Sequence, residues 1–386
     1  MLIKSLPANK AGKLSIPRLQ YFGKPLTQFS PLLKCDSCMY NPKTYTVESV
    51  TSGHPDKVCD QISDAILDAC LAQDPLSRVA VESFGGHGHL VIGGEITTCS
   101  EIDVAAIARE VYGNIGYTDP LTIDVRLVRQ SPDIAQGVDT GGAGDQGIMY
   151  GYATNETPEY LPWAVVKVHE IARRLEQARR SGNIPHLKPD GKTQITMRDG
   201  RVDSVLVSVQ HDVGTNQGTL RDDIVHRIVE PAIGNLSSVK IYTNPTGKFE
   251  LGGFAADAGL TGRKIMVDTY CGLVPHGGGA FSGKDATKVD RSAAYMARFA
   301  AKNLVHKGYG NKILVSVAYA IGKAEPLMIH AVNEHGHDLS SETKRFFDFR
   351  PLAIIERLGL RKPIFRGTAT YGHFGKSGFA WEAILS

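Results

Sequence analysis

The chain has 386 residues, of which 42% are hydrophobic and 22% charged, so it is long enough to form two or three domains with buried cores. Its net charge of +3 arises in residues 1–43, where seven basic residues and one acid give +6, so the remainder carries about −3. This distribution argues against a nucleic-acid surface on the folded body. A membrane span is also disfavoured, because no apolar run approaches the roughly 18 residues that a bilayer requires.

Residues 1–42 form a basic leader that five prolines interrupt. A transit peptide is one interpretation, but the leader holds a single arginine and its prolines break any amphipathic helix. A disordered tail, or a start that lies too early in the chain, is favoured, since Met39 offers a second start. The leader is therefore left out of the prediction of the fold.

The six cysteines do not suggest a metal site or a disulfide framework. Cys35 and Cys38 form a CxxC pair in the leader, but no second pair of ligands accompanies them. The other four cysteines are scattered, as in a reduced cytosolic enzyme, so we expect a cytoplasmic location.

The patterned part of the chain opens with a strand at Tyr45–Val50, followed by a helix that begins near Pro55. A helix N-terminus with His54, Asp56 and Lys57 beside it is suited to an anion and a metal. The alternative is that Asp56 only compensates the helix dipole and His54 only caps the helix.

Two strands follow the first helix. Arg78–Phe84 alternates so that Glu82 lies opposite Val79 and Val81, and residues 90–98 contain an acid, Glu95, among apolar neighbours. Two His-x-His pairs, at 87–89 and 335–337, have strand spacing for metal ligands, but no cysteine or carboxylate is close, so turn histidines at the surface are favoured.

The segment 130–147 is polar and rich in glycine, which is typical of a mobile flap over a site, with a plain linker as the alternative. The other expected elements are a helix at 101–113, a strand at 121–129, a helix at 163–180, a loop at 187–194, a strand at 204–212, a helix at 220–232, a helix at 288–306 and a strand at 312–320.

Three predicted strands resemble one another. RVAVESF (78–84), SVLVSVQHD (204–212) and KILVSVAYA (312–320) lie more than a hundred residues apart, and each belongs to a set of strands and helices. Three related α+β units, each packing helices on one face of a sheet, would explain the pattern.

The stretch 252–292 combines three features of a site for a polyphosphate and its metal. Glycines allow close approach of the backbone, cations bind phosphate oxygens and carboxylates hold a hard cation. Its charged residues are Asp257, Arg263, Lys264, Asp268, Lys284, Asp285, Lys288 and Asp290. A glycine-rich surface loop with solvated charges is the alternative.

An ordinary phosphate loop is disfavoured in this stretch. Residues 278–284 fit G-x-x-x-x-G-K, but Asp285 stands where that motif needs a Ser or Thr hydroxyl for Mg²⁺. The strand-like run Lys264–Tyr270 also ends too early, with Pro275 and His276 in between.

Taken together, the motifs resemble those of the S-adenosylmethionine synthetase (methionine adenosyltransferase) family, over nearly everything from Tyr45 to Trp381. All of them in this order are highly specific. They are SGHPDK (52–57), GGEITT (93–98), QSPDIAQGV (130–138), GAGDQG (142–147), YGYATNET (150–157), GLTGRK (259–264), HGGGAFSGKD (276–285), KVDRSAAY (288–295) and YGHFG (371–375).

The resemblance implies an α+β fold of three similar domains around a pseudo-threefold axis, which we place at 43–140, 141–251 and 252–386 with the possibility of interleaved segments. It also implies a dimer, often doubled to a tetramer, with sites at the interface. The implied reaction joins L-methionine to ATP: sulfur attacks the ribose C5′ and expels triphosphate, which is then cleaved to pyrophosphate and phosphate.

The resemblance also assigns roles to matching residues. The catalytic residues would be His54, Lys192, Arg263 and Lys284. ATP would contact these four and Asp190, Lys248, Phe249, Asp257, Lys264 and Ala280. Methionine would contact Glu95, Gln130, Asp257 and Lys288, and Asp145 would be a further acid of the site. The implied metal ligands are Asp56 and Asp290 for Mg²⁺, two ions per site, and Glu82 for K⁺.

The sequence departs from the family pattern at a few positions. The flap between Asp139 and Gly144 looks shorter than in many relatives, and Lys248 stands where relatives often have arginine, which loses a planar stacking surface. Two other function classes remain: a P-loop kinase or ATPase, which Asp285 disfavours, and a non-catalytic homologue, which would be expected to have lost a cation or carboxylate of the site.

Overall fold

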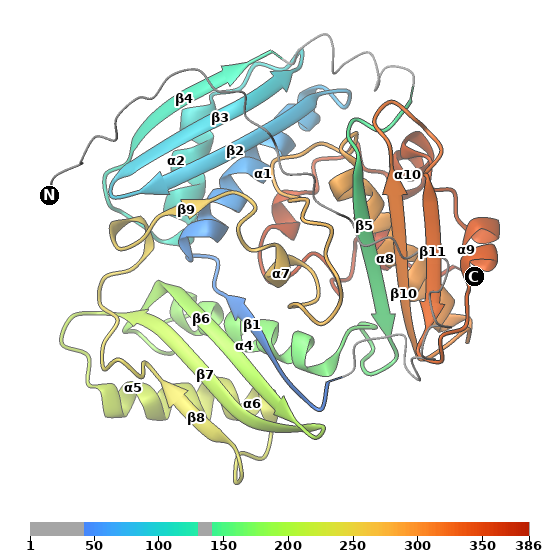
Figure 1. Ribbon diagram of the computed structural model, residues 1–386. Coiled ribbons are helices and arrows are strands. Elements are labelled where there is room, and N and C mark those ends of the chain that lie inside the picture. Colours follow the sequence, from blue (N-terminus) through green and yellow to red (C-terminus); the bar gives the residue numbers. More distant parts are fainter. Residues whose placement is uncertain (1–41, 130–140, 386) are drawn as a thin grey trace, which may run out of the picture. The chain divides into compact units, whose positions relative to one another are not determined.

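The computed structural model describes residues 42–129 and 141–385. In this part of the chain the strands form three sheets. Figure 1 shows these sheets on three sides of the short helix α7 (Ile265–Asp268). The mixture of helices and mostly antiparallel sheets confirms the predicted α+β class.

The first sheet has the strand order β4-β3-β2-β9 and packs on helices α1 (Pro55–Gln73) and α2 (Val104–Ile115). Its strands are β2 (Arg78–Gly86), β3 (His89–Thr97), β4 (Thr122–Val128) and β9 (Gly259–Leu260). The alternation in β2 is as predicted, because Val79 and Val81 are buried against the helices whereas Glu82 is exposed.

The second sheet has the order β1-β6-β7-β8 and packs chiefly on α4 (Trp163–Arg180). Its strands are β1 (Thr44–Val50), β6 (Leu187–Arg198), β7 (Arg201–His211) and β8 (Lys240–Thr243). The helix predicted at 220–232 is three consecutive pieces, α5 (Gln217–Ile224), the π-helix η1 (Val225–Val229) and α6 (Glu230–Ile233).

The third sheet has the order β11-β10-β5 and packs on α8 (Val289–His306). Its strands are β5 (Gly147–Thr154), β10 (Lys312–Tyr319) and β11 (Met328–Asn333). The remaining elements are η2 (Gly253–Ala255), α9 (Ser340–Phe346), α10 (Pro351–Leu358), η3 (Arg366–Thr368) and η4 (Ala380–Glu382).

The three similar strands of the sequence, β2, β7 and β10, each occupy an internal position of a different sheet. Each sheet also recruits a strand from a distant part of the chain: β9 joins β2, β1 joins β6 and β5 joins β10. The sheets are therefore built from interleaved segments, and the proposed domain boundaries remain a prediction.

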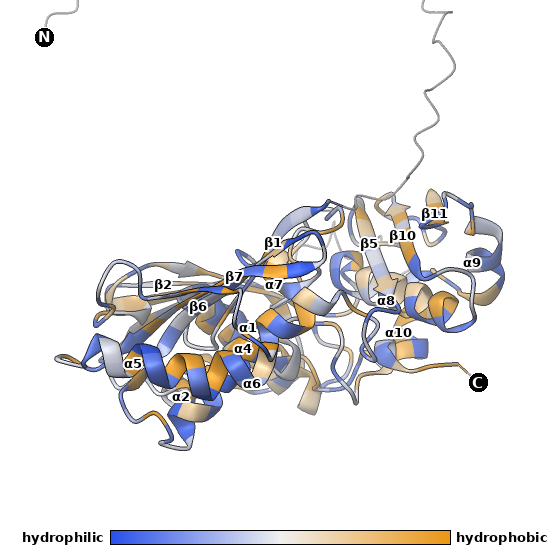
Figure 2. Ribbon diagram, turned by 90° about the horizontal axis from the view of Figure 1, so that it is seen from below, coloured by the Kyte–Doolittle hydropathy of each residue, from blue (hydrophilic) through white to orange (hydrophobic). Residues whose placement is uncertain are grey.

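The helices lie on one side of each sheet. Figure 2 shows α4, α5 and α6 below the strands β6 and β7. On the first sheet this leaves apolar side chains on the opposite face, where Phe84 is 51% and Val91 is 40% exposed. No helix in residues 42–129 and 141–385 is both long and apolar enough to cross a membrane.

Helix α1 is anchored by four aspartates spaced four residues apart, which therefore lie along one face of the helix. Each carboxylate accepts hydrogen bonds from backbone amides of distant loops: Asp56 from Leu260, Asp60 from Gly262, Asp64 from Gly283, and Asp68 from Phe365 and Arg366, all at 2.8–2.9 Å. Buried carboxylates need such partners, so α1 fixes the path of the chain around it.

Two predicted elements are wrong. The expected loop at 187–194 is the first part of β6, which tolerates Pro189 because the strand register shifts between Leu187 and Gly191, where a proline interrupts no regular ladder. The strand-like run at 264–270 contains α7 instead. Its amides bond within the turn, as the Asp268 amide does to the Lys264 carbonyl, since the described structure provides no neighbouring strand.

Candidate functional site

The N-terminus of α1 presents a neutral imidazole. His54 caps the helix, its Nδ1 accepting from the Asp56 amide at 3.2 Å, which leaves the proton on Nε2. Burial, together with the charges of Lys264 and Lys192, lowers the pKa of His54 to about 3. The Nε2–H group is therefore a hydrogen-bond donor without a full charge.

Asp56 gathers cations around its carboxylate. Lys264 donates to Oδ2, the Leu260 amide donates to Oδ1 at 2.9 Å, and the Arg263 Nε lies 3.6 Å from Oδ1. Although burial opposes the charge, these hydrogen bonds from Lys264 and Leu260 lower the pKa of Asp56, so it is a carboxylate. The Arg263 side chain is 55% exposed and so accessible to a ligand.

The loop that carries His54 is held from three directions. The Ser52 amide donates to the Tyr371 hydroxyl at 3.2 Å, the Tyr117 hydroxyl donates to the Gly53 carbonyl at 2.6 Å, and Gln61 donates to the Ser52 carbonyl at 2.7 Å. These contacts come from the carboxyl-terminal segment, the end of α2 and α1. The loop is thus rigidly positioned.

A second cluster lies where the glycine-rich stretch enters α8. Lys284 donates to Asp290 at 2.7 Å, and Lys288 donates to the buried Asp285. A Cβ atom on Gly279 would lie 2.2 Å from Asp290 Oδ1, so glycine is required for this approach.

An open groove of about 480 Å³ on the outer face of the first sheet brings four predicted site residues together. Its lining includes Glu82, Glu95, Ala280 and Lys284. Leu260 also lines the groove, and its amide bonds to Asp56. Leu260 therefore connects the lining of the groove to the cluster at α1.

Asp190 and Lys192 approach the same region from β6. Asp190 accepts from the Gly253 amide at 2.9 Å, and burial raises its pKa to about 6. Its Oδ1 has no hydrogen-bond partner in the described structure, which leaves an acceptor for a ligand. Lys192 pairs with Val50 in the β1–β6 ladder and is close enough to lower the pKa of His54.

The remaining predicted residues are less closely joined. Asp257 is near enough to raise the pKa of Asp190. Lys248 bonds to Glu250 at 3.1 Å and the Phe249 amide to His211 at 3.0 Å, while Asp145 accepts from the neighbouring Gln146 amide. Within the described residues, Lys248, Phe249 and Asp145 make no hydrogen bond or ion pair with the other predicted site residues. Gln130 lies outside the described residues.

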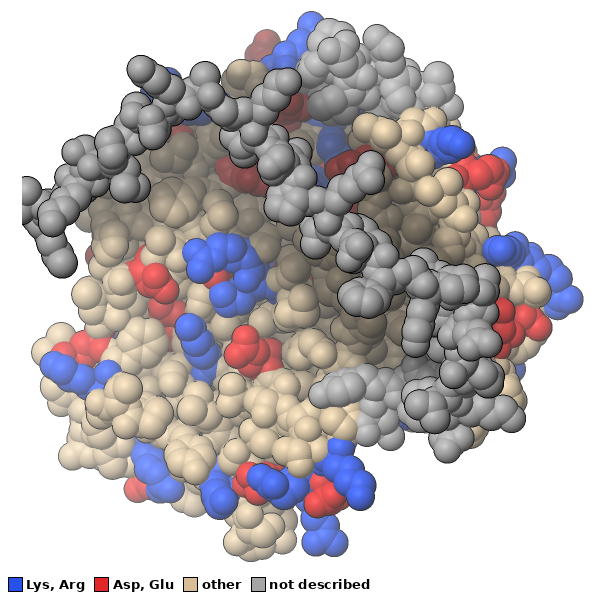
Figure 3. Space-filling model, viewed as in Figure 1, with Lys and Arg blue, Asp and Glu red and all other residues tan. Residues whose placement is uncertain are grey.

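Charged side chains of both signs are grouped near the centre of the face that Figure 3 shows. Nevertheless, in residues 42–129 and 141–385 no three His, Cys, Asp or Glu side chains are placed to hold a metal together. A metal at Asp56 or Asp290 would need ligands from a substrate.

Comparison with known proteins agrees with this arrangement. Family models of the N-terminal, central and C-terminal domains of S-adenosylmethionine synthetase match residues 42–136, 140–249 and 251–383. The chain belongs to the S-adenosylmethionine synthetase family. The prediction of an enzyme, a methionine adenosyltransferase, is thereby confirmed.

The alignments with curated relatives span most of this chain. The chain is 48% identical to the S-adenosylmethionine synthase of Pseudothermotoga lettingae over 382 residues, which cover 89% of this chain and 96% of the relative. It is 50% identical to S-adenosylmethionine synthase 1 of Rhodospirillum rubrum over 364 residues (87% and 95%) and 46% identical to the S-adenosylmethionine synthase of Bifidobacterium adolescentis over 388 (88% and 96%).

Three residues that position the site of this family member are not among those predicted from the sequence. Tyr371 lies within the YGHFG motif, whereas Tyr117 and Gln61 belong to none of the motifs. The four-residue spacing of aspartates in α1 was a signal that could have been found, because it predicts one helix face with carboxylates.

Proposed function

We propose that the enzyme makes S-adenosylmethionine from ATP and L-methionine by attack of the methionine sulfur on the ribose C5′. Triphosphate leaves and is then cleaved to pyrophosphate and phosphate. The observation that supports this most directly is the convergence of His54, Arg263 and Lys264 on Asp56, next to a groove that contains Lys284.

Charge on the leaving group explains this set of residues. Cleavage of the C5′–O5′ bond places negative charge on an already anionic triphosphate, so preorganised donors and cations lower the barrier. Neutral His54 would donate from Nε2 to the oxygen at the junction of ribose and phosphate. Arg263, Lys264, Lys284 and Lys192 would bind phosphate oxygens. A thioether sulfur has no proton to remove, so no general base is required.

Methionine would bind at the groove. Glu95 in its lining would bind the ammonium group, and Lys288, which follows the groove residue Lys284 in the chain, would bind the carboxylate, with Asp257 and Gln130 as further partners. The apolar side chains of Phe84 and Val91, which line the groove, would lie beside the thioether arm. Asp190, Lys248, Phe249 and Ala280 would contact the nucleotide, and Asp145 would be a further acid of the site.

Divalent cations would complete the triphosphate site. Asp56 and Asp290 fit Mg²⁺ because each is a single carboxylate beside lysines, and Mg²⁺ is commonly bound by one or two carboxylates plus substrate phosphates. The bound Mg²⁺ ions would neutralise the charge that develops on the triphosphate. Glu82, exposed in the groove, would hold K⁺.

We further propose that two copies associate through their sheets, as a dimer or as a tetramer of two dimers. Support comes from the apolar outer face, where Phe84 and Val91 are exposed in the same groove as Glu82, Glu95 and Lys284. A second copy would exclude water from this groove. The free cysteines of the described residues favour a reducing, cytoplasmic location.

The decisive experiment is incubation of the purified chain with ATP, methionine, Mg²⁺ and K⁺, with mass analysis of the products. We expect the sulfonium product together with pyrophosphate and phosphate. Formation of ADP would favour a kinase or ATPase, and absence of any turnover would favour a non-catalytic homologue.

A further inference from the structure

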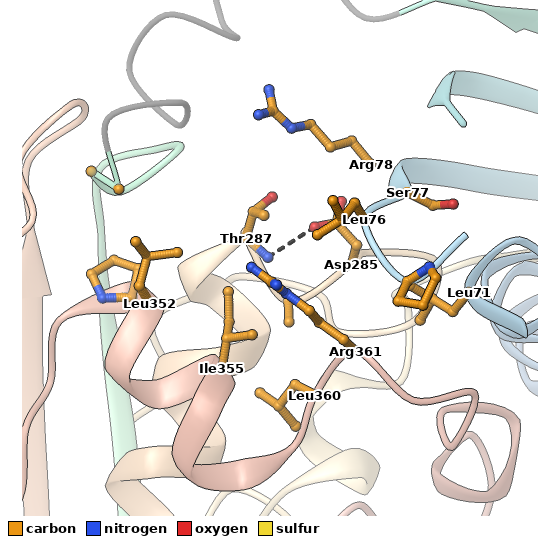
Figure 4. Close-up of a pocket in the computed structure, with 15 residues that line it drawn as sticks. Leu71, Leu76, Ser77, Arg78, Asp285, Thr287, Leu352, Ile355, Leu360 and Arg361 are labelled. Carbon is orange, nitrogen blue, oxygen red and sulfur yellow. Dashed lines mark hydrogen bonds between the residues drawn. The ribbon is translucent and has the colours of Figure 1, made fainter. Parts of the chain in front are cut away.

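A separate cavity of about 340 Å³ lies behind the turn that carries Lys284 and Lys288. Figure 4 shows that α10, the segment around Leu71 and Leu76, and the turn at Asp285–Thr287 enclose it. Most of its lining is apolar: Leu71, Pro75, Leu76, Ala286, Pro351, Leu352, Ile355 and Leu360. This volume and this lining are in the range of sites for small organic molecules.

A guanidinium group faces this apolar lining. Arg361 is exposed, and Figure 4 shows its side chain directed into the cavity toward Thr287. Within residues 42–129 and 141–385 no hydrogen bond or ion pair to its side chain is formed. Arg78 lines the cavity as well. A cation of this kind, next to apolar walls, is complementary to an anionic group on an apolar body.

The acid in the wall does not oppose an anion. The carboxylate of Asp285 is buried and is saturated by donors: the Val79 amide at 2.7 Å, the Thr287 amide at 2.8 Å and the ammonium group of Lys288. Its charge is thus compensated inside the protein. The positive charge of Arg361 therefore determines the preference of the cavity for an anionic group.

The same turn connects the cavity to the candidate active site. Asp285 and Thr287 face the cavity, whereas Lys284 lines the groove on the other side and pairs with Ala80 of β2. Lys288 is bound to Asp285. A molecule that displaces this turn even slightly would therefore move two of the cations assigned to substrate.

We propose that this cavity is an effector site for a small organic anion with a flat or branched apolar body. The anionic group binds Arg361, and the apolar body lies against Leu352, Ile355 and Leu71. Occupation of the cavity acts on methionine binding through Asp285 and Lys288, a consequence that rests on the proposed function, whereas binding itself does not.

The binding test uses naphthoate and its neutral counterpart naphthalenemethanol, measured by isothermal titration with the full chain. Wild type binds naphthoate more tightly than the alcohol. Arg361→Gln weakens naphthoate binding roughly tenfold, the value of one charge-assisted hydrogen bond, and leaves the alcohol unchanged. Leu352→Trp, at a half-exposed position, fills the cavity and weakens both ligands.

Two matched variants separate this cavity from other cationic surfaces. Lys362→Gln removes a neighbouring positive charge that does not line the cavity, and Lys284→Gln removes a cation of the groove. Both retain naphthoate binding. Equal losses in Arg361→Gln and Lys362→Gln, loss in Lys284→Gln, or unchanged binding in Leu352→Trp would overturn the site.

The coupling is tested by kinetics. Naphthoate changes the KM for methionine in wild type and has no effect in Leu352→Trp, while Lys362→Gln behaves as wild type. A response that persists in Leu352→Trp, or naphthoate binding without any change of KM, would refute the coupling. If the chain made no S-adenosylmethionine at all, the proposed function would fail and the calorimetric result would still decide the site.

Discussion

Tyr371 connects the carboxyl-terminal segment to the loop that presents His54. Its hydroxyl accepts from the Ser52 amide and donates to Glu176 on α4, while its backbone has a positive φ of 57°, uncommon for a residue with a side chain. Such a conformation persists where the surroundings fix it. We therefore regard Tyr371 as a positioning residue.

Removal of this hydroxyl in Tyr371→Phe should lower kcat roughly tenfold with little change in the KM for methionine, because the His54 loop loses one of its supports while the ring still fills its space. Steady-state kinetics measures this. Tyr319→Phe is the control, because it likewise removes a buried tyrosine hydroxyl that is hydrogen-bonded, here to the Phe349 carbonyl at 2.6 Å. Equal effects of the two substitutions on kcat would show that Tyr371 is only structural.

Lys284 lines the groove, so its charge lies at the point where the proposed triphosphate departs. Its hydrogen bond to Asp290 holds the ammonium group there. Lys284→Met should slow the chemical step by roughly a hundredfold or more and alter methionine affinity only slightly. Single-turnover kinetics separates the two quantities.

An exposed lysine just after α8 provides the comparison for Lys284. Lys307→Met removes the same charge and should retain wild-type rates. If Lys284→Met reduced binding and rate in equal measure, its charge would act in the ground state and not on the departing phosphates.

At the scale of elements, β5 and α8 approach unusually closely. A Cβ atom on Gly151 of β5 would lie only 2.0 Å from the backbone carbon of Ala297 in α8. Gly151→Ala should therefore lower the free energy of unfolding by about 3 kcal/mol, because neither backbone can move away without breaking its own hydrogen bonds. Urea unfolding measures the change.

Gly113 offers the opposite case within α2. Nothing lies within 4 Å of a Cβ atom at this helical position. Gly113→Ala should raise the free energy of unfolding by roughly 0.5–1 kcal/mol, since alanine loses less backbone entropy in a helix. A lower free energy of unfolding in Gly113→Ala would contradict the assignment of its effect to backbone entropy.

The elements show which part of the fold the sequence determines locally. The helices at Trp163–Arg180 and Val289–His306 were predicted nearly to the residue, because long amphipathic segments carry their own period. The run at 187–194 was not, since Pro189 indicates a loop unless the register shift in β6 is known. That shift depends on the partner strand.

The site follows the same rule. Motifs identified His54, Asp56, Arg263 and Lys264 one by one, and the structure brings them together at α1. Their meeting could not be read from spacing, because it depends on amides of distant loops bonding to the aspartates of α1. Local pattern specifies the groups, whereas long-range hydrogen bonds specify their geometry.

At the scale of the whole molecule, the buried histidines make stability depend on pH. His169 on α4 accepts or donates at 2.8 Å to Ser49 of β1, and burial, with smaller effects of Arg173 and Lys376, lowers its pKa to about 3. The unfolded chain takes up this proton near pH 6.5. The contribution of neutral His169 is therefore complete above about pH 6.5 and is lost as pH falls toward 3.

We expect the free energy of unfolding to fall less steeply between pH 7 and pH 5 in His169→Gln than in wild type, by up to roughly 1.4 kcal/mol per pH unit. Asp68 and Asp190, whose pKa values burial raises to about 6, act in the opposite direction in both proteins, so the difference of slopes isolates the histidine. Urea midpoints across this range test it, and parallel slopes would contradict the assignment.

Self-association is also a property of the whole molecule, because the outer face of the first sheet carries both apolar side chains and predicted site residues. Phe84 is half exposed on this face and shares its groove with Glu82 and Glu95. A glutamate at position 84 would add a third carboxylate to the groove, and a twofold interface would bury this carboxylate from each of the two copies. Phe84→Glu should therefore weaken association at least a hundredfold, about 2.7 kcal/mol, and reduce activity in parallel.

Light scattering across a range of protein concentrations, with activity measured on the same samples, tests this coupling. Val213→Glu is the control, because Val213 is 84% exposed in the turn after β7, away from the first sheet, and its substitution adds the same charge. Val213→Glu should keep the wild-type molar mass in light scattering and the wild-type activity. A Phe84→Glu monomer with full activity would show that one chain completes its own site, and the groove would then need closure from within the chain.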